Sequence, residues 1–123
     1  NELVVGDDSL LGENDTTTSR WGHLLESLSK SNAHVLALQE VTPRFVDLLQ
    51  SQPWVQTTYA LSATTKDLNT ISPYGNLLLW NNEVFSPSSL HLCLDNHRTR
   101  AIVASLIPNH DPSSVYLVAN VHL

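Results

Sequence analysis

The chain has 123 residues, of which 41% are hydrophobic and only 15% carry a charge. This composition can build a core and excludes a disordered chain, although the share of charged residues is low for a globular domain. The net charge of -6 excludes a protein that holds nucleic acid through a basic surface alone. If the chain acts on a phosphate, a metal ion would have to supply the missing positive charge.

The chain start and the single cysteine limit the domain organisation. The sequence contains no Met, so Asn1 is not a natural translation start, and we expect residues 1–123 to be one partial domain truncated at both ends. Cys93 as the only cysteine excludes an internal disulfide and a CxxC metal site, and it suits a reducing intracellular compartment without establishing one. No apolar run approaches the roughly 20 residues that span a bilayer, so no membrane span is expected.

Two helices are expected in the first half of the chain. After a polar segment typical of an exposed loop, apolar residues recur at helical spacing until Asn32, a residue that favours a helix end. Thr42 and Pro43 offer an N-cap hydroxyl and a first-turn proline to a second helix, which Pro53 ends. The expected order here is a loop over 6–19, a helix over 18–31, a strand over 35–38 and a helix from 42 to 52.

The remainder of the chain shows strand patterns without helical periodicity. Leucines alternate with polar residues over 90–94, which indicates a half-buried strand. The last two strands flank a turn-rich connection, 108–114, and are expected to pair as an antiparallel hairpin. The strands expected in this half are 55–61, 75–80, 90–94, 101–107 and 115–122.

This order of elements predicts an α/β (α+β) fold in which a mixed β-sheet carries helices on one face. The strand over 35–38 is apolar without alternation, as in a strand that is covered on both faces. Nothing in the predicted elements covers the second face of the sheet. We therefore expect a second layer to be missing from the chain.

A carboxylate after the first strand is the most informative candidate for chemistry. Gln39 and Glu40 follow the buried strand directly before the capped helix, at a sheet edge where α/β proteins usually bind ligands. Glutamate is a hard oxygen donor that suits Mg²⁺. The alternative is that Glu40 is a solvated turn residue, favoured by the dipole of the helix that follows. Position alone leaves both interpretations open.

Residues 20–52, with Leu-Gln-Glu-Val at 38–41, resemble the first half of the endonuclease/exonuclease/phosphatase superfamily, which has the DNase I-like fold. Within it, the likeness is to tyrosyl-DNA phosphodiesterase 2-like members. The same order continues with Tyr-Gly-Asn-Leu-Leu-Leu at 74–79, an arginine before a strand, and Asn-Val-His-Leu at 120–123. The resemblance implies about half of a four-layer α/β sandwich.

The resemblance also implies roles for single residues. It implies that Glu40 binds the catalytic Mg²⁺, with Mn²⁺ as the alternative ion, and that His122 contacts the scissile phosphate. The alternative for His122 is an ordinary histidine near a chain end. Asn1 stands at about the separation from Glu40 at which the family has a strand-ending asparagine. Asn120 either lines the cleft or forms a turn. The remaining histidines are expected to be structural or solvated: His23, His34, His91, His97 and His110.

The implied activity is Mg²⁺-dependent hydrolysis of a phosphoester by a phosphodiesterase or nuclease. The substrates left open are DNA or RNA ends, a tyrosyl-DNA adduct, and a small phosphoester such as a phosphoinositide or sphingolipid head group. The family's later Gly-Asp-x-Asn and Ser-Asp-His motifs are absent, so the chain is expected to be inactive without the C-terminal half of its domain. The alternatives are a non-catalytic α/β interaction module and a small-molecule phosphoesterase of the same superfamily.

Overall fold

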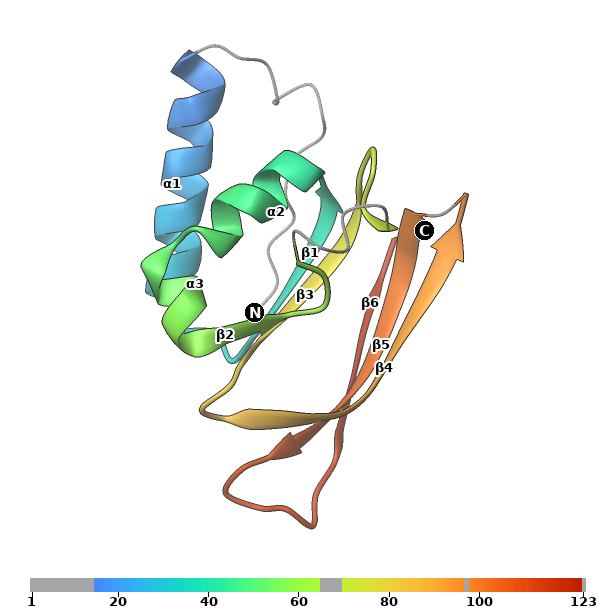
Figure 1. The fold of residues 1–123 in the computed structure, drawn as a ribbon. Coiled ribbons are helices and arrows are strands. Elements are labelled where there is room, and N and C mark those ends of the chain that lie inside the picture. Colours follow the sequence, from blue (N-terminus) through green and yellow to red (C-terminus); the bar gives the residue numbers. More distant parts are fainter. Residues whose placement is uncertain (1–14, 65–69, 97, 123) are drawn as a thin grey trace.

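The computed structural model describes residues 15–64, 70–96 and 98–122 (Figure 1). Helices and strands alternate in the first half of this part, and strands alone follow. The elements are, in chain order, α1 (Asp15–Ser31), β1 (Val35–Val41), α2 (Pro43–Gln50), α3 (Pro53–Thr58), β2 (Tyr59–Leu61), β3 (Gly75–Asn81), β4 (Phe85–Asp95), β5 (Arg98–Pro108) and β6 (Tyr116–Val121). Helix α1 begins three residues before the expected start. None of the described helices is long and apolar enough to cross a membrane.

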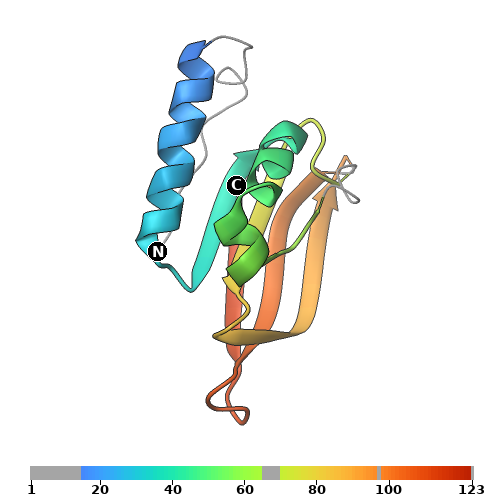
Figure 2. The same cartoon turned by 60° about the vertical axis from the view of Figure 1, so that its left-hand side comes forward.

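The strands form two three-stranded sheets, in the orders β1-β3-β2 and β4-β5-β6. The expectation of one mixed sheet was wrong, because every strand pair of the described part is antiparallel. The helices cover one face of the first sheet, as expected, and the second sheet lies on its other face (Figures 1 and 2). The fold is α/β in layers, and the chain itself supplies the layer that the sequence interpretation treated as missing.

Alternation along β3 explains why both faces of the first sheet are covered. Leu77 and Leu79 point into the core beneath the helices, whereas Leu78 and Trp80 point into a second core between the two sheets. Successive strand residues face opposite sides, so an unbroken apolar run marks a strand that is buried on both faces. The second core contains Leu78, Trp80, Phe85, Ile102, Ala104 and Leu106.

The segment after α2 corrects a sequence prediction. Thr42 caps α2 as expected, since its Oγ1 accepts a hydrogen bond from the Phe45 backbone N–H at 3.2 Å. Pro53, however, does more than end a helix, because it occupies the first turn of α3. The strand predicted over 55–61 was therefore wrong over 55–58. A first-turn proline and backbone bonds to the Gln52 carbonyl override the β-propensity of Val and Thr.

The predicted C-terminal hairpin is confirmed. β5 and β6 pair antiparallel from Ala101 opposite Val121 to Leu106 opposite Tyr116. β4 is longer than expected and is not half-buried, because it forms an edge of the second sheet, whereas β5 is the central strand of that sheet. Its inward leucines stay partly solvated, with Leu90 39% and Leu92 36% exposed.

Candidate active site

One rim of the two-sheet sandwich gathers the polar residues that the sequence singled out. The end of β1 meets the start of β3 through the pair Val41 and Gly75, and the end of β6 meets β5 through the pair Val121 and Ala101. Because these sheets are antiparallel, the rim is not the carboxyl edge of a parallel sheet, on which the expectation for Glu40 was based. The rim combines the ends of two strands with the beginnings of two others.

Glu40 lies in a β-bulge inside β1 and not after the end of the strand. Leu38 pairs with Leu77 and Val41 with Gly75, so two residues of β1, Gln39 and Glu40, oppose one residue of β3. Glu40 adopts φ 56°, the left-handed region that residues with a Cβ rarely occupy. Such a conformation costs on the order of 1–3 kcal/mol and clusters at functional sites, where it directs a side chain.

The Glu40 side chain is half-buried and has no hydrogen-bond or ion-pair partner within the described ranges. Thr42, and not Glu40, caps α2. The carboxylate is therefore neither committed to a helix end nor neutralised by an arginine or lysine of the described part. Since a carboxylate in such a place needs a compensating positive charge or water, this geometry leaves it available to a cation.

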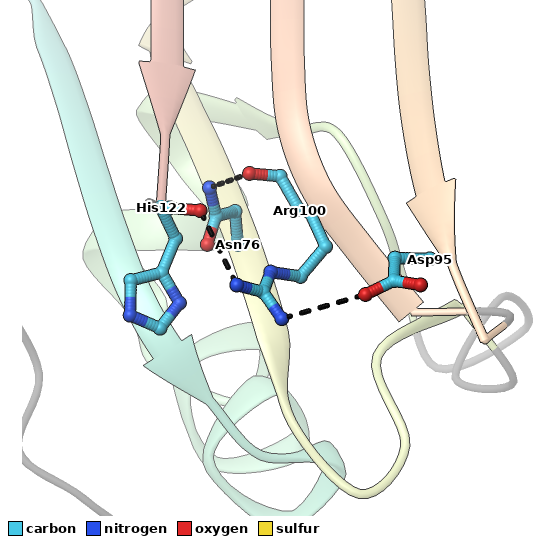
Figure 3. A network of polar contacts seen from close by, with 4 residues as sticks. All are labelled: Asn76, Asp95, Arg100 and His122. Atoms are coloured by element: carbon cyan, nitrogen blue, oxygen red, sulfur yellow. Dashed lines mark hydrogen bonds and ion pairs between the residues drawn. The ribbon is translucent and has the colours of Figure 1, made fainter.

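His122 lies on the same rim and is tied to β5 (Figure 3). Its backbone N–H donates to the Arg100 carbonyl at 3.0 Å, and Arg100 Nη2 donates to the His122 carbonyl at 3.5 Å. Arg100 Nη1 also lies 3.7 Å from Asp95 Oδ2. The Val121 carbonyl accepts a hydrogen bond from Gln39 Nε2 at 2.6 Å. The residues directly before Glu40 and before His122 are thus bonded to each other.

Two buried asparagines join the sheets behind these residues. Asn76 is 1% exposed and its Nδ2 donates to the carbonyls of Arg100 at 3.0 Å and Asn120 at 3.1 Å. Asn120 is 2% exposed and its Nδ2 donates to the carbonyls of Leu38 at 3.0 Å and Leu77 at 2.9 Å. Both amide nitrogens are therefore fully occupied by backbone contacts between the sheets. A role of Asn120 in contacting substrate stays a prediction.

Asn76 is the residue that sequence reasoning missed. The signal was present, because an asparagine interrupts the start of an otherwise apolar strand, and a buried polar side chain there needs partners. Its Oδ1 and Arg100 Nε are buried without a partner among the described residues. The polar network at this rim is thus incomplete on the side of Asn76 and Arg100.

The remaining candidates divide between described and undescribed residues. Asn1 and His97 lie outside the described residues, so the expectations for them stay as they were. His34 is exposed, and its ring packs edge-on against Phe85 with 6.4 Å between ring centroids. The other described histidines of the earlier set are also exposed, as a solvated role requires: His23, His91 and His110.

The donor set fits one kind of metal site. No three His, Cys, Asp or Glu side chains cluster anywhere in the part of the chain that is described, so a fully protein-ligated ion has no site there. Mg²⁺ commonly takes one or two carboxylates and fills its other positions with water and phosphate oxygens. The carboxylate of Glu40, which has no partner among the described residues, fits that requirement as one such ligand.

Comparison with known proteins gives the fold. ANGEL2, described as a 2′,3′-cyclic phosphatase, is similar in its complex with adenosine-2′,3′-vanadate (TM-score 0.66, 22% identity, 94% of this chain and 34% of that chain). A second ANGEL2 structure gives a TM-score of 0.66 at 20% identity, over 94% of this chain and 33% of that chain. Humanized D. rerio TDP2 gives a TM-score of 0.62 at 15% identity, over 88% of this chain and 41% of that chain. No protein-family model and no curated protein matches the sequence.

These similarities confirm the expected resemblance at the level of the fold. ANGEL2 and TDP2 are members of the endonuclease/exonuclease/phosphatase, or DNase I-like, superfamily. The described layers correspond to part of that fold, and the chain spans about a third of the length of the ANGEL2 structures that it matches.

Proposed function

We propose that the protein is a metal-dependent phosphoric-ester hydrolase, to which this chain contributes a metal-binding carboxylate, Glu40, and a phosphate-contacting imidazole, His122. The observation that carries the proposal is the conformation of Glu40. The residue is held at φ 56° in a bulge, has no partner in the described part, and lies on the rim that also holds His122. Backbone strain that leaves a carboxylate unpaired is difficult to explain by packing alone.

The bound ion would be Mg²⁺, with Mn²⁺ as the alternative, and Glu40 would hold it. When bound, such an ion polarises a phosphate oxygen and stabilises the charge of the leaving oxygen. The residues of the chain perform the other tasks. The bulge fixes the Glu40 backbone, Arg100 holds the His122 backbone through two hydrogen bonds, and the His122 ring donates a hydrogen bond to the phosphate as negative charge builds up.

The substrate class that we propose is a phosphoester at the end of a nucleotide or nucleic acid. The support is the fold similarity to ANGEL2, whose structure holds adenosine-2′,3′-vanadate. A tyrosyl-DNA adduct and a small phosphoester head group remain within the same chemistry. The family motifs that would complete the metal site are absent from these 123 residues, so the chain requires further residues of its domain for turnover.

A non-catalytic interaction module is the alternative function. This alternative requires Glu40 to cap a helix or to form an ion pair with an arginine or lysine. A strained carboxylate without a partner would serve no purpose in an interaction module. Thr42 takes the capping role, and no described Arg or Lys pairs with Glu40. These contacts favour the hydrolase.

The test is Mg²⁺-dependent hydrolysis by the protein at its natural length. The substrates are an RNA with a 2′,3′-cyclic phosphate end, a 5′-tyrosyl DNA and a chromogenic phosphodiester, each with added Mg²⁺ and with EDTA. We expect Glu40→Ala to lower the metal-dependent rate by at least about 100-fold, because the loss of a residue that only supports a metal ligand already costs about 10- to 100-fold. Glu83→Ala, in the exposed turn before β4, is the matched control and should keep the full rate. Full activity of Glu40→Ala would refute the metal assignment.

A further inference from the structure

Three side-chain amides form a clamp between the two sheets at the rim. We call Gln39, Asn76 and Asn120 the amide clamp. Gln39 joins β1 to β6, Asn76 joins β3 to β5 and β6, and Asn120 joins β6 to β1 and β3. Every one of these bonds runs from a side-chain N–H to a backbone carbonyl. Each therefore fixes the position of a backbone segment.

The clamp surrounds the bulge of β1. Asn120 donates to the carbonyls of Leu38 and Leu77, which are the last regular pair of β1 and β3 before the bulge. Asn76 is the one residue of β3 opposite Gln39 and Glu40. A bulge disrupts the regular ladder of backbone hydrogen bonds, so its geometry depends on the contacts that replace that ladder. Here the clamp provides those contacts.

The clamp also explains how Glu40 keeps its left-handed backbone. Strained conformations persist only where the surroundings over-determine them. Asn76 and Asn120 are almost fully buried, and their amide nitrogens are occupied. Relaxing the bulge would strip buried carbonyls of their donors, which is unfavourable in a water-excluded place. The same contacts hold the end of β6, because Asn120 is the penultimate residue of that strand and His122 directly follows it.

We propose that Asn76 is a positioning residue of the site: through its bonds to Arg100 and Asn120 it holds the Glu40 bulge and the His122 end of β6 at the spacing that a metal-bound phosphate needs. This inference rests on the proposed function, because it assigns Asn76 to the same site. Asn76 touches neither the ion nor the phosphate in this account. Gln39 contributes to the same device through its bond to Val121.

The first test measures backbone protection without any metal. In the protein at its natural length, we expect Asn76→Ala to raise amide hydrogen exchange at Glu40, Val41 and His122 by at least about 10-fold while the far end of the sheets is unchanged. The matched control is Asn109→Ala. Asn109 also makes two side-chain hydrogen bonds, with Ser86 Oγ at 2.7 Å and the Asn82 carbonyl at 3.1 Å, but at the opposite end of the sheets.

The second test measures metal dependence. Residues that hold a metal ligand from behind typically change metal affinity by about 10- to 100-fold when they are mutated, so Asn76→Ala should raise the Mg²⁺ concentration for half-maximal hydrolysis by about that factor. Asn109→Ala should leave this Mg²⁺ concentration unchanged, even if it lowers the midpoint of unfolding as much as Asn76→Ala does. If Asn76→Ala fails to fold, Gln39→Ala, which removes one exposed hydrogen bond of the clamp, should give a smaller increase in the same direction.

The outcomes separate the two proposals. Loss of activity in Glu40→Ala together with an unchanged Mg²⁺ requirement and unchanged exchange in Asn76→Ala would overturn the positioning role alone. The same holds for Gln39→Ala when Asn76→Ala does not fold. Full activity of Glu40→Ala would instead overturn the proposed function. If Asn109→Ala and Asn76→Ala are equally stable and raise the Mg²⁺ requirement by the same factor, the effect is a general structural one. That outcome would also overturn the positioning role.

Discussion

At the scale of single residues, the site depends on where the backbone places a carboxylate. The sequence showed Glu40 and His122 as candidates because each ends an apolar segment in a pattern that resembles a known family. It did not show the bulge, since a register change depends on which strand lies opposite. The sequence marked Asn76 as a polar residue at the start of an apolar strand, but it could not show that the amide donates to two strands of the other sheet.

Glu40→Gly should separate stability from function. Glycine tolerates a positive φ without the Cβ clash, so we expect Glu40→Gly to be more stable than Glu40→Ala by about 1 kcal/mol in the free energy of unfolding. Both variants should have lost the metal-dependent activity, because neither carries the carboxylate. Urea unfolding of the two variants measures the difference. An alanine variant at least as stable as the glycine variant would show that the backbone of residue 40 is not strained.

At the scale of elements, the local sequence patterns predicted most helices and strands. They failed in the segment after α2, where the type of element depends on how the chain turns. The cap at Thr42, β1, β3 and the β5–β6 hairpin were predicted from local signals. The strand expected over 55–58 is α3 instead, because proline can begin a helix as readily as it ends one. β-propensity is a weak guide for so short a segment, since packing and backbone hydrogen bonds override it.

The stability that the β5–β6 connection contributes should decrease at acid pH, because it depends on the ionised carboxylate of Asp111. Hydrogen bonds from Ser114 Oγ, at 2.5 Å, and Ser113 Oγ, at 2.7 Å, lower the pKa of this carboxyl below its usual 3.8. A lowered pKa in the folded state gives stability that is present above pH 3.8 and is lost as the pH falls through the folded value.

Asp111→Asn should therefore be less stable than the parent chain at pH 7, and the difference should shrink as the pH falls below 3.8. Thermal unfolding at a series of pH values measures this. A constant difference for Asp111→Asn across the acid range would contradict the account of the turn.

At the scale of the whole molecule, one sheet face remains solvated. Residues paired directly across β5 and β6 share a face, and Val103 with Ala119, Ser105 with Leu117, and Ala101 with Val121 form the face directed away from the first sheet. On it Val103 is 39%, Val121 43% and Leu117 75% exposed. The sequence interpretation expected an uncovered apolar face on the first sheet, but the uncovered face lies on the second. Layer order depends on contacts between distant segments, which local patterns do not contain.

This face should promote self-association of the 123-residue chain, because contiguous exposed apolar surface favours contact between molecules. We expect Leu117→Lys to reduce the fraction of dimers and larger species in sedimentation velocity, with no loss of folding. Gln56→Lys, which adds the same charge at an exposed position of α3, should leave the distribution as it is. Equal effects of the two substitutions would attribute the change to net charge and not to this face.

The central claim is that the carboxylate of Glu40 is reserved for a divalent cation. Its most direct test is the binding of Mn²⁺ to the protein at its natural length, followed by the loss of the free-ion electron paramagnetic resonance signal, with the parent protein, Glu40→Ala and Glu83→Ala compared. We predict saturable binding that Mg²⁺ competes away, that Glu83→Ala retains and that Glu40→Ala loses. Identical binding curves for the parent protein and Glu40→Ala would contradict the account.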